Sequence, residues 1–131
     1  MKSMYFWLSC CLLAACASVS SVAPARAIAP FKKEFDKLYV KPAPGSDAEK
    51  SLAAAVKTAK CDVCHRGEKK KERNAYGDAL DKLLDKKADA KDLVKIQSAL
   101  KQVESEPSDP KDSASPTFGD LIKQGKLPVA K

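Results

Sequence analysis

The sequence predicts an all-α fold, a small bundle of short helices. Apolar side chains recur at helical spacing in several segments between residues 30 and 104. No alternating pattern typical of a half-buried strand appears near the centre of the chain. The part of the chain that carries these segments is long enough for one small domain.

Residues 1–27 are predicted to be a signal peptide. An apolar run from Met4 to Val19 follows Lys2, and Ala25-Arg26-Ala27 has the A-x-A form of a cleavage site. The run is too short to span a membrane comfortably. The alternative is a lipoprotein signal, in which Cys16 would be lipidated and anchor the domain to a membrane face. Both interpretations place the domain outside the cytoplasm, either periplasmic or secreted.

Two helices are predicted in the first half of the domain. Pro30 suits the first position of a helix, because its missing N–H has no helical partner there. The apolar side chains that follow at helical spacing are Phe31, Phe35 and Leu38. A second helix is expected over roughly Asp47–Lys60, because Ser46 and Glu49 have the spacing of a capping box.

Three shorter helices are expected later in the chain. Asn74 and Asp89 are predicted N-caps, and Thr117 is the expected cap of a last helix ending at Gly125. The apolar residues expected on the first two of these helices are Tyr76, Leu80, Leu83 and Leu84, then Leu93, Ile96, Leu100 and Val103. Residues 105–115 have the proline-rich and serine-rich composition of a linker that buries nothing. We therefore expect a folded domain over 28–104 and a linker with a helical tail over 105–131.

The most specific motif is Cys-x-x-Cys-His at residues 61–65, the pattern that attaches a covalent c-type haem. The thiols of Cys61 and Cys64 would add to the two porphyrin vinyl groups, and His65 would be the proximal iron ligand. Zinc would require about four ligands, and the chain after the signal peptide offers only these three Cys and His side chains. A thioredoxin-like redox pair would require a βαβ setting, which the pattern does not indicate.

A helix leading into this motif, followed by a loop and further helices, resembles the small single-haem cytochromes c. The resemblance covers about residues 30–104. It implies a small cytochrome c-like bundle of short helices around one covalently attached haem c. It also implies one-electron transfer between redox partners. Because the sequence contains no catalytic triad pattern, we do not expect enzymatic activity. The positions that carry over are Cys61 and Cys64 for the thioethers and His65 for the proximal ligand.

The sequence departs from this family at the second axial ligand, which is usually a methionine. Its two methionines are Met1 and Met4, and it has a single histidine. The sixth position is therefore open or filled by another group, with Tyr76 as the first choice, although Tyr76 would also suit stacking against the porphyrin. The full set of candidates is Tyr39, Asn74, Tyr76, the Lys69–Lys71 run, a free N-terminal amine and water.

An open sixth position defines an alternative function, the binding or sensing of carbon monoxide or nitric oxide by the haem iron. A small peroxidase is a weaker alternative, because no second histidine is present to act as the base. The sequence does not indicate an oligomeric state.

The net positive charge of the chain limits the kinds of partner that it is expected to bind. The chain has 24 basic and 17 acidic residues, a net charge of +7. The basic loop at residues 66–73 is either a solvated turn or a docking patch for an acidic redox partner. No aromatic side chains interleave with these charges, so a nucleic-acid partner is not expected. A membrane partner is expected only if Cys16 is lipidated.

Overall fold

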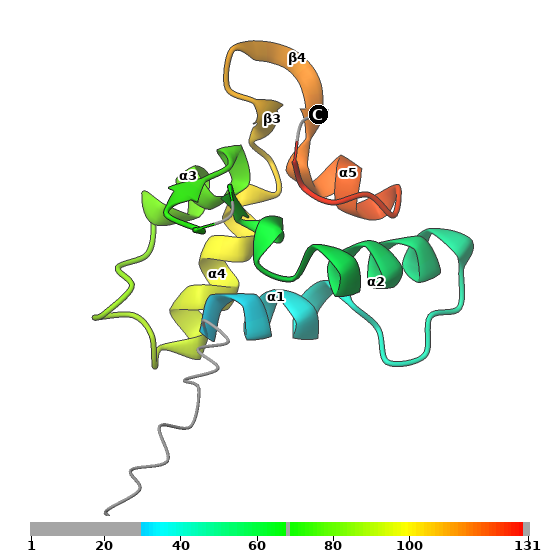
Figure 1. Ribbon diagram of the computed structural model, residues 1–131, viewed down its shortest axis with the longest axis horizontal. Helices are drawn as coiled ribbons and strands as arrows, with labels where there is room; N and C mark the ends of the chain where they lie inside the picture. Colours follow the sequence, from blue (N-terminus) through cyan, green and yellow to red (C-terminus); the bar gives the residue numbers. More distant parts are fainter. Residues whose placement is uncertain (1–29, 68, 130–131) are drawn as a thin grey trace, which may run out of the picture.

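The structure is a computed structural model that describes residues 30–67 and 69–129. The predicted signal peptide and Cys16 lie outside these residues. None of the described helices has the length and apolarity needed to cross a membrane. The elements run in the order shown in Figure 1: α1 (Pro30–Tyr39), α2 (Asp47–Ala59), the short 3₁₀ helix η1 (Lys60–Val63), β1 (His65–Arg66), β2 (Glu72–Arg73), α3 (Ala75–Asp81), α4 (Leu93–Val103), β3 (Pro107–Asp109), β4 (Asp112–Thr117) and α5 (Phe118–Lys123).

The all-α prediction is wrong, because the described residues form helices together with two small antiparallel sheets. Strand β1 pairs with β2, and β3 pairs with β4. The strands are short and consist largely of charged residues, serine and proline. These residue types are uncommon in strands and form no alternating apolar pattern here, so the sequence did not indicate them. The fold is a small domain of helices plus strands.

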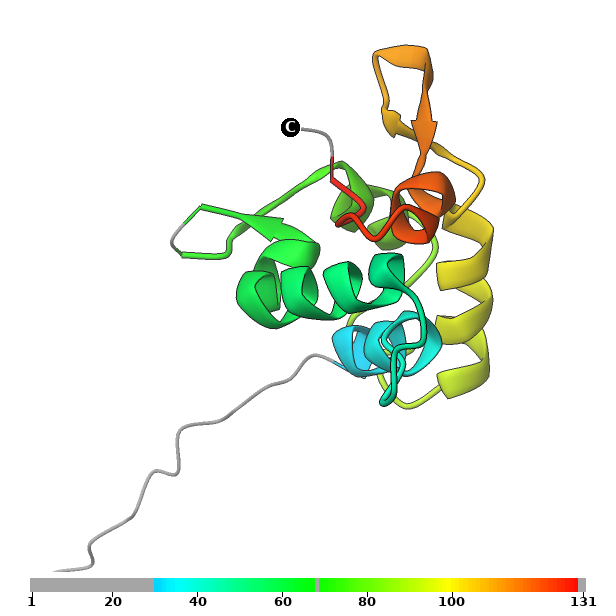
Figure 2. The ribbon, with the colours of Figure 1, turned by 90° about the vertical axis from the view of Figure 1, so that its right-hand side faces the viewer.

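The prediction that residues 105–115 form a linker that buries nothing is also wrong. This segment forms the β3–β4 hairpin, which projects from the helices in Figure 2. Its polar side chains hold the backbone: the Asp109 carboxylate accepts from Lys111 N at 2.9 Å, and the Ser115 hydroxyl accepts from Asp109 N at 3.0 Å. Ser108 is buried. Short polar side chains that bond to nearby backbone therefore order a segment that lacks apolar residues.

The predicted starts of four helices are confirmed, at Pro30, Ser46, Asn74 and Thr117. Helix α1 begins at Pro30, and the Ser46 hydroxyl caps α2 by accepting from Glu49 N at 3.2 Å. The Glu49 carboxylate in turn accepts a hydrogen bond from Ser46 N, which completes the capping box. Thr117 and Asp120 form the same motif at the start of α5. Each signal is local, because the bonds close within a few residues.

Helix α3 is shorter than predicted and ends at Asp81. The chain then turns, because the Asp85 carboxylate accepts from Lys87 N at 2.8 Å and from Ala88 N at 2.6 Å. These bonds offer the backbone an alternative to the helical ladder. Leu84 remains buried although it lies outside the helix.

The N-cap of α4 is Asp92 and not the predicted Asp89. Helix α4 begins at Leu93, and the Asp92 carboxylate accepts from Lys95 N at 2.9 Å. The Asp89 carboxylate instead accepts from Asp85 N at 2.8 Å and from Lys95 Nζ at 2.7 Å. Both aspartates precede an apolar helical pattern, so the choice between them depends on the path of the preceding loop.

One hydrophobic core joins the helices. Helix α1 packs against α4, and α5 packs against α2 (Figures 1 and 2). The ring of Tyr76 lies at its centre, edge-on to Phe35 at 5.8 Å and to Phe118 at 5.1 Å between ring centroids. Phe118 therefore places the predicted tail helix α5 in the same core as the residues around the Cys-x-x-Cys-His motif.

A buried carboxylate, Glu34, links α1 to α4. Its side chain is 1% exposed and accepts from Lys37 Nζ at 2.6 Å and from Gln97 Nε2 at 2.8 Å. The bond from Lys37, followed by that from Gln97, lowers the pKa of Glu34 below its ordinary value of 4.5. The charged form is therefore the one that the folded state stabilises.

We expect the stability of the protein to fall as the pH drops below about 4.5, in part through Glu34. The folded pKa is the lower one, so the contribution is fully present above the unfolded pKa and is lost as the pH falls through the folded pKa. Thermal unfolding between pH 6 and pH 3 should show a flatter profile for Glu34→Gln than for the wild type. Parallel profiles for the two proteins would contradict this role of Glu34.

Candidate haem-attachment site

The Cys-x-x-Cys-His motif lies in a tight turn at the end of α2. The chain leaves α2 through Lys60, whose φ of +50° is left-handed, and enters η1. Cys64 N then donates to the Cys61 carbonyl at 3.2 Å. Val63 is fully buried and anchors the turn in the core, whereas Cys61 is exposed and Cys64 is partly buried. The turn thus brings the two sulfur-bearing residues together at the edge of the core.

His65 begins strand β1, directly after this turn. Its Nδ1 lies 3.3 Å from the carbonyl oxygen of Glu72 on strand β2. A histidine that binds a metal through one ring nitrogen commonly donates its other N–H to a carbonyl, which fixes the tautomer and the ring. In the tautomer that carries its proton on Nδ1, His65 donates to this carbonyl and leaves Nε2 free to bind a metal.

Asn74 fastens the motif to α3. Its side-chain Nδ2 donates to the Asp62 carbonyl at 3.0 Å and to the Val63 carbonyl at 3.1 Å, and its backbone N–H donates to the Cys64 carbonyl at 3.1 Å. Its Oδ1 accepts from Gly77 N at 2.9 Å and so caps α3, as predicted. One side chain therefore ends the motif turn and starts the next helix.

Gly77 lets α3 approach the motif closely. A Cβ at this position would lie 3.0 Å from the Cys64 carbonyl carbon and closer still to its oxygen. The first turn of α3 can rest on the Cys64 backbone only because position 77 lacks a side chain. The sequence pattern did not indicate this role of Gly77, although a glycine inside a predicted helix commonly has a packing reason.

Both cysteines are free thiols. Burial raises the pKa of the Cys64 thiol to about 12. Among residues 30–67 and 69–129, no group of three or more His, Cys, Asp or Glu side chains is placed to hold a metal ion.

Tyr76 is placed as the sequence predicted, on the buried face of α3. Its side chain is fully buried, and its hydroxyl has no hydrogen-bond partner within the described part of the chain. Burial raises the pKa of Tyr76, with smaller contributions from Tyr39, Cys64 and Glu104. The role of Tyr76 as a haem contact stays a prediction.

Several of the other candidates for the sixth iron ligand already form hydrogen bonds or salt bridges in the structure. The Tyr39 hydroxyl donates to Glu104 Oε1 at 2.7 Å. The Asn74 amide is bonded to the motif turn, and the Lys70 amine forms a salt bridge with Asp62. Lys69 and Lys71 are exposed, and the N-terminal amine lies outside the described residues. Tyr39, Asn74 and Lys70 would each have to give up these contacts to bind iron.

The loop of residues 66–73 is a hairpin whose charges are largely paired. Arg66 pairs with Glu72 at 3.1 Å, and Arg73 pairs with Asp81 at 2.6 Å. Lys70 forms a salt bridge with Asp62. The remaining cations of the run, Lys69 and Lys71, form no salt bridge with another described residue. The sequence predicted either a solvated turn or a docking patch here.

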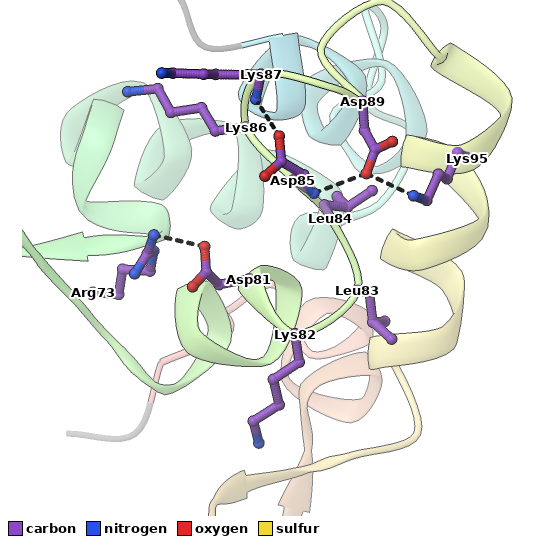
Figure 3. A pocket seen from close by; sticks show the side chains of 10 residues that line it. All are labelled: Arg73, Asp81, Lys82, Leu83, Leu84, Asp85, Lys86, Lys87, Asp89 and Lys95. Atoms are coloured by element: carbon purple, nitrogen blue, oxygen red, sulfur yellow. Dashed lines mark hydrogen bonds and ion pairs between the residues drawn. The ribbon is translucent and has the colours of Figure 1, made fainter.

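A cavity of about 660 Å³ lies beside this hairpin, between α3, the loop after α3 and α4 (Figure 3). Five basic and three acidic side chains line it, together with Leu83 and Leu84. Two of these cations are paired, Arg73 with Asp81 and Lys95 with Asp89. The lining suits polar or anionic groups and not the apolar faces of a porphyrin, and it does not include Cys61, Cys64 or His65.

The motif turn carries the residue types that a covalently held haem would use. Cys61 and Cys64 lie in one turn, and beside them His65 contacts the Glu72 carbonyl through Nδ1. No protein-family model, no curated protein and no solved structure matches this chain. Any proposal for the function of the chain therefore rests on the chemistry of these residues.

Proposed function

We propose that this chain is an exported c-type cytochrome with one covalent haem, which transfers single electrons between redox partners outside the cytoplasm. The observation that carries the proposal is the Cys-x-x-Cys-His turn, in which the Glu72 carbonyl contacts His65 Nδ1. When bound, a haem supplies a reversible one-electron couple at its iron.

The residues of the chain would hold this group and limit its movement. Cys61 and Cys64 would form the two thioether links, and His65 would bind the iron through Nε2. Asn74 holds the backbone of the same turn through two carbonyl groups. A rigid turn favours fast electron transfer, because little of the protein needs to rearrange when the charge on the iron changes.

The exposed cations near the turn support an acidic redox partner. Lys69 and Lys71 lie in the hairpin loop that follows His65, and both are exposed. Positive charge beside an electron-transfer site increases the rate of encounter with an acidic surface, and salt screens this effect. Reduction by such a partner should therefore slow as the ionic strength rises.

The proposal is tested by expressing the full chain in a bacterial host that matures c-type cytochromes. Intact mass should show the polypeptide plus one haem, and the product should cycle between ferric and ferrous states. The Cys61→Ala/Cys64→Ala variant should carry no covalent haem. The matched control Asp62→Ala changes the same motif without removing a thiol and should keep it. A wild-type chain with the bare polypeptide mass would overturn the proposal.

A second function, the binding or sensing of carbon monoxide or nitric oxide, is favoured by one observation. Residues 30–129 contain no methionine and no histidine other than His65. A haem iron held by His65 would then lack the usual methionine ligand, and a small molecule would be able to bind in its place. Carbon monoxide added to the reduced protein distinguishes the two functions: a large shift of the Soret band supports ligand binding, and an unchanged band supports the electron carrier.

A further inference from the structure

The cavity beside α3 lies outside the site proposed for haem. It has a volume of about 660 Å³, and the residues that line it come from β2, α3, the loop of residues 82–92 and α4 (Figure 3). Sites for small molecules commonly have volumes of about 300–1,000 Å³. The cavity is therefore large enough for a small organic molecule, and no residue of the Cys-x-x-Cys-His motif lines it.

The three carboxylates of the lining already have partners within the chain. Asp81 pairs with Arg73 at 2.6 Å. Asp89 accepts from Asp85 N at 2.8 Å and from Lys95 Nζ at 2.7 Å. The Asp85 carboxylate accepts from two backbone N–H groups of its own loop, at 2.8 Å and 2.6 Å. The charge that remains for a ligand therefore comes from basic side chains.

Three lysines of the lining, Lys82, Lys86 and Lys87, have no such partner. Their amines form neither a salt bridge nor a hydrogen bond with another described residue, and all three residues are exposed. With five basic and three acidic side chains, the lining carries a net charge of +2. Positive charge gathered in a concave site attracts anions from solution.

Two of these lysines extend from an ordered turn. Figure 3 shows the side chains of Lys86 and Lys87 extending in the same direction, with the Arg73 guanidinium on that side of the cavity. The turn is held by the bond from Lys87 N to the Asp85 carboxylate. Arg73 contacts Asp81 through Nη2, and a guanidinium carries several N–H donors, so others remain for a ligand. These three cations can therefore act on one anionic group.

We propose that the cavity binds a small organic molecule that carries a phosphate group. A phosphate ester has about two negative charges at neutral pH and three acceptor oxygens, which suits the charge of the lining better than a single carboxylate does. Lys86, Lys87 and Arg73 would bind the phosphate. The organic part would contact Leu83 and Leu84, the apolar side chains of the lining. This inference goes beyond the proposed function and does not depend on haem attachment.

The test is calorimetric titration of the full chain with phenyl phosphate. We expect Lys86→Ala/Lys87→Ala to weaken binding by about tenfold or more, because charge-assisted hydrogen bonds are lost. Both substitutions keep the backbone N–H of residue 87 that holds the turn. The matched control Lys69→Ala/Lys71→Ala removes the same charge from the β1–β2 loop and should bind as the wild type does. Equal losses in the two variants, or no binding to the wild type, would overturn the inference.

Two further ligands test which chemical groups the cavity selects. Benzoate has the same ring with one negative charge, and inorganic phosphate has no ring to cover the leucines. Both should bind the wild type more weakly than phenyl phosphate does. Benzoate binding as tightly as phenyl phosphate would contradict the choice of phosphate.

NMR of the wild-type protein tests where the ligand binds. Phenyl phosphate should shift the backbone amide signals of residues 82–89, because the lysine pair belongs to this segment. Shifts centred on the β1–β2 loop instead would show that the ligand binds elsewhere and would contradict the assignment of the cavity.

Discussion

Replacing Gly77 by alanine is expected to lower the free energy of unfolding by about 2 kcal/mol and to reduce haem attachment. The added methyl group would lie 3.0 Å from the Cys64 carbonyl carbon and 3.2 Å from Arg73 Cβ. Overpacking costs about 1–3 kcal/mol, and a backbone obstacle favours the upper end of that range. Alanine regains about 1 kcal/mol of helix propensity, so the packing cost exceeds the gain.

Chemical denaturation of the wild type and of Gly77→Ala measures the change in the free energy of unfolding. Intact mass measures the fraction of each protein that carries haem. The control is Gly45→Ala, because the nearest atom to a Cβ there is Glu49 Oε2 at 3.8 Å in an exposed loop. Gly45→Ala should alter stability by no more than about 0.5 kcal/mol. If Gly77→Ala were as stable as this control, the close approach of α3 to the motif would not require glycine.

Replacing Asn74 by alanine is expected to have the largest effect, a loss of about 3 kcal/mol in the free energy of unfolding. Loss of the N-cap on α3 accounts for about 1 kcal/mol. The carbonyl groups of Asp62 and Val63 would each lose a donor, at about 1 kcal/mol apiece. Because these carbonyls belong to the motif turn, we also expect a lower yield of attached haem.

Two variants divide the effect of Asn74 into its parts. Asn74→Asp keeps an oxygen that accepts from Gly77 N but has no N–H to donate, so it should recover about 1 kcal/mol at most. Ser46→Ala removes the cap of α2, at a cost of about 1 kcal/mol, and leaves the motif turn intact. If Asn74→Ala cost no more than Ser46→Ala, the amide contacts with the turn would contribute nothing.

Part of the fold was predictable because its signals are local. The capping boxes at Ser46 and Thr117 close between residues three positions apart, so their spacing identifies the helix starts. Pro30 likewise fits the first helical position without reference to the rest of the chain. The Cys-x-x-Cys-His motif belongs to the same category, since its spacing is visible in five consecutive residues.

Other elements were not predictable because short polar side chains in those segments have several nearby backbone partners to choose from. Asp89 and Asp92 both precede an apolar helical pattern, and Asp92 became the cap because Asp89 binds the backbone of Asp85. The β3–β4 hairpin has the composition of a linker, and the side chains of Asp109 and Ser115 give it order. In both regions, short polar side chains choose between several nearby backbone groups, and sequence spacing does not rank those choices.

The sequence by itself determined which residues form the Cys-x-x-Cys-His pattern and where four of the helices begin. Only the tertiary structure decided that the Glu72 carbonyl contacts His65, that α3 rests on the Cys64 backbone at Gly77, and that the Tyr76 hydroxyl is buried without an acceptor. The physical reason is the range of the interactions. A cap or a motif is completed within a few residues, whereas orientation, close approach and burial depend on segments that meet only when the chain has folded.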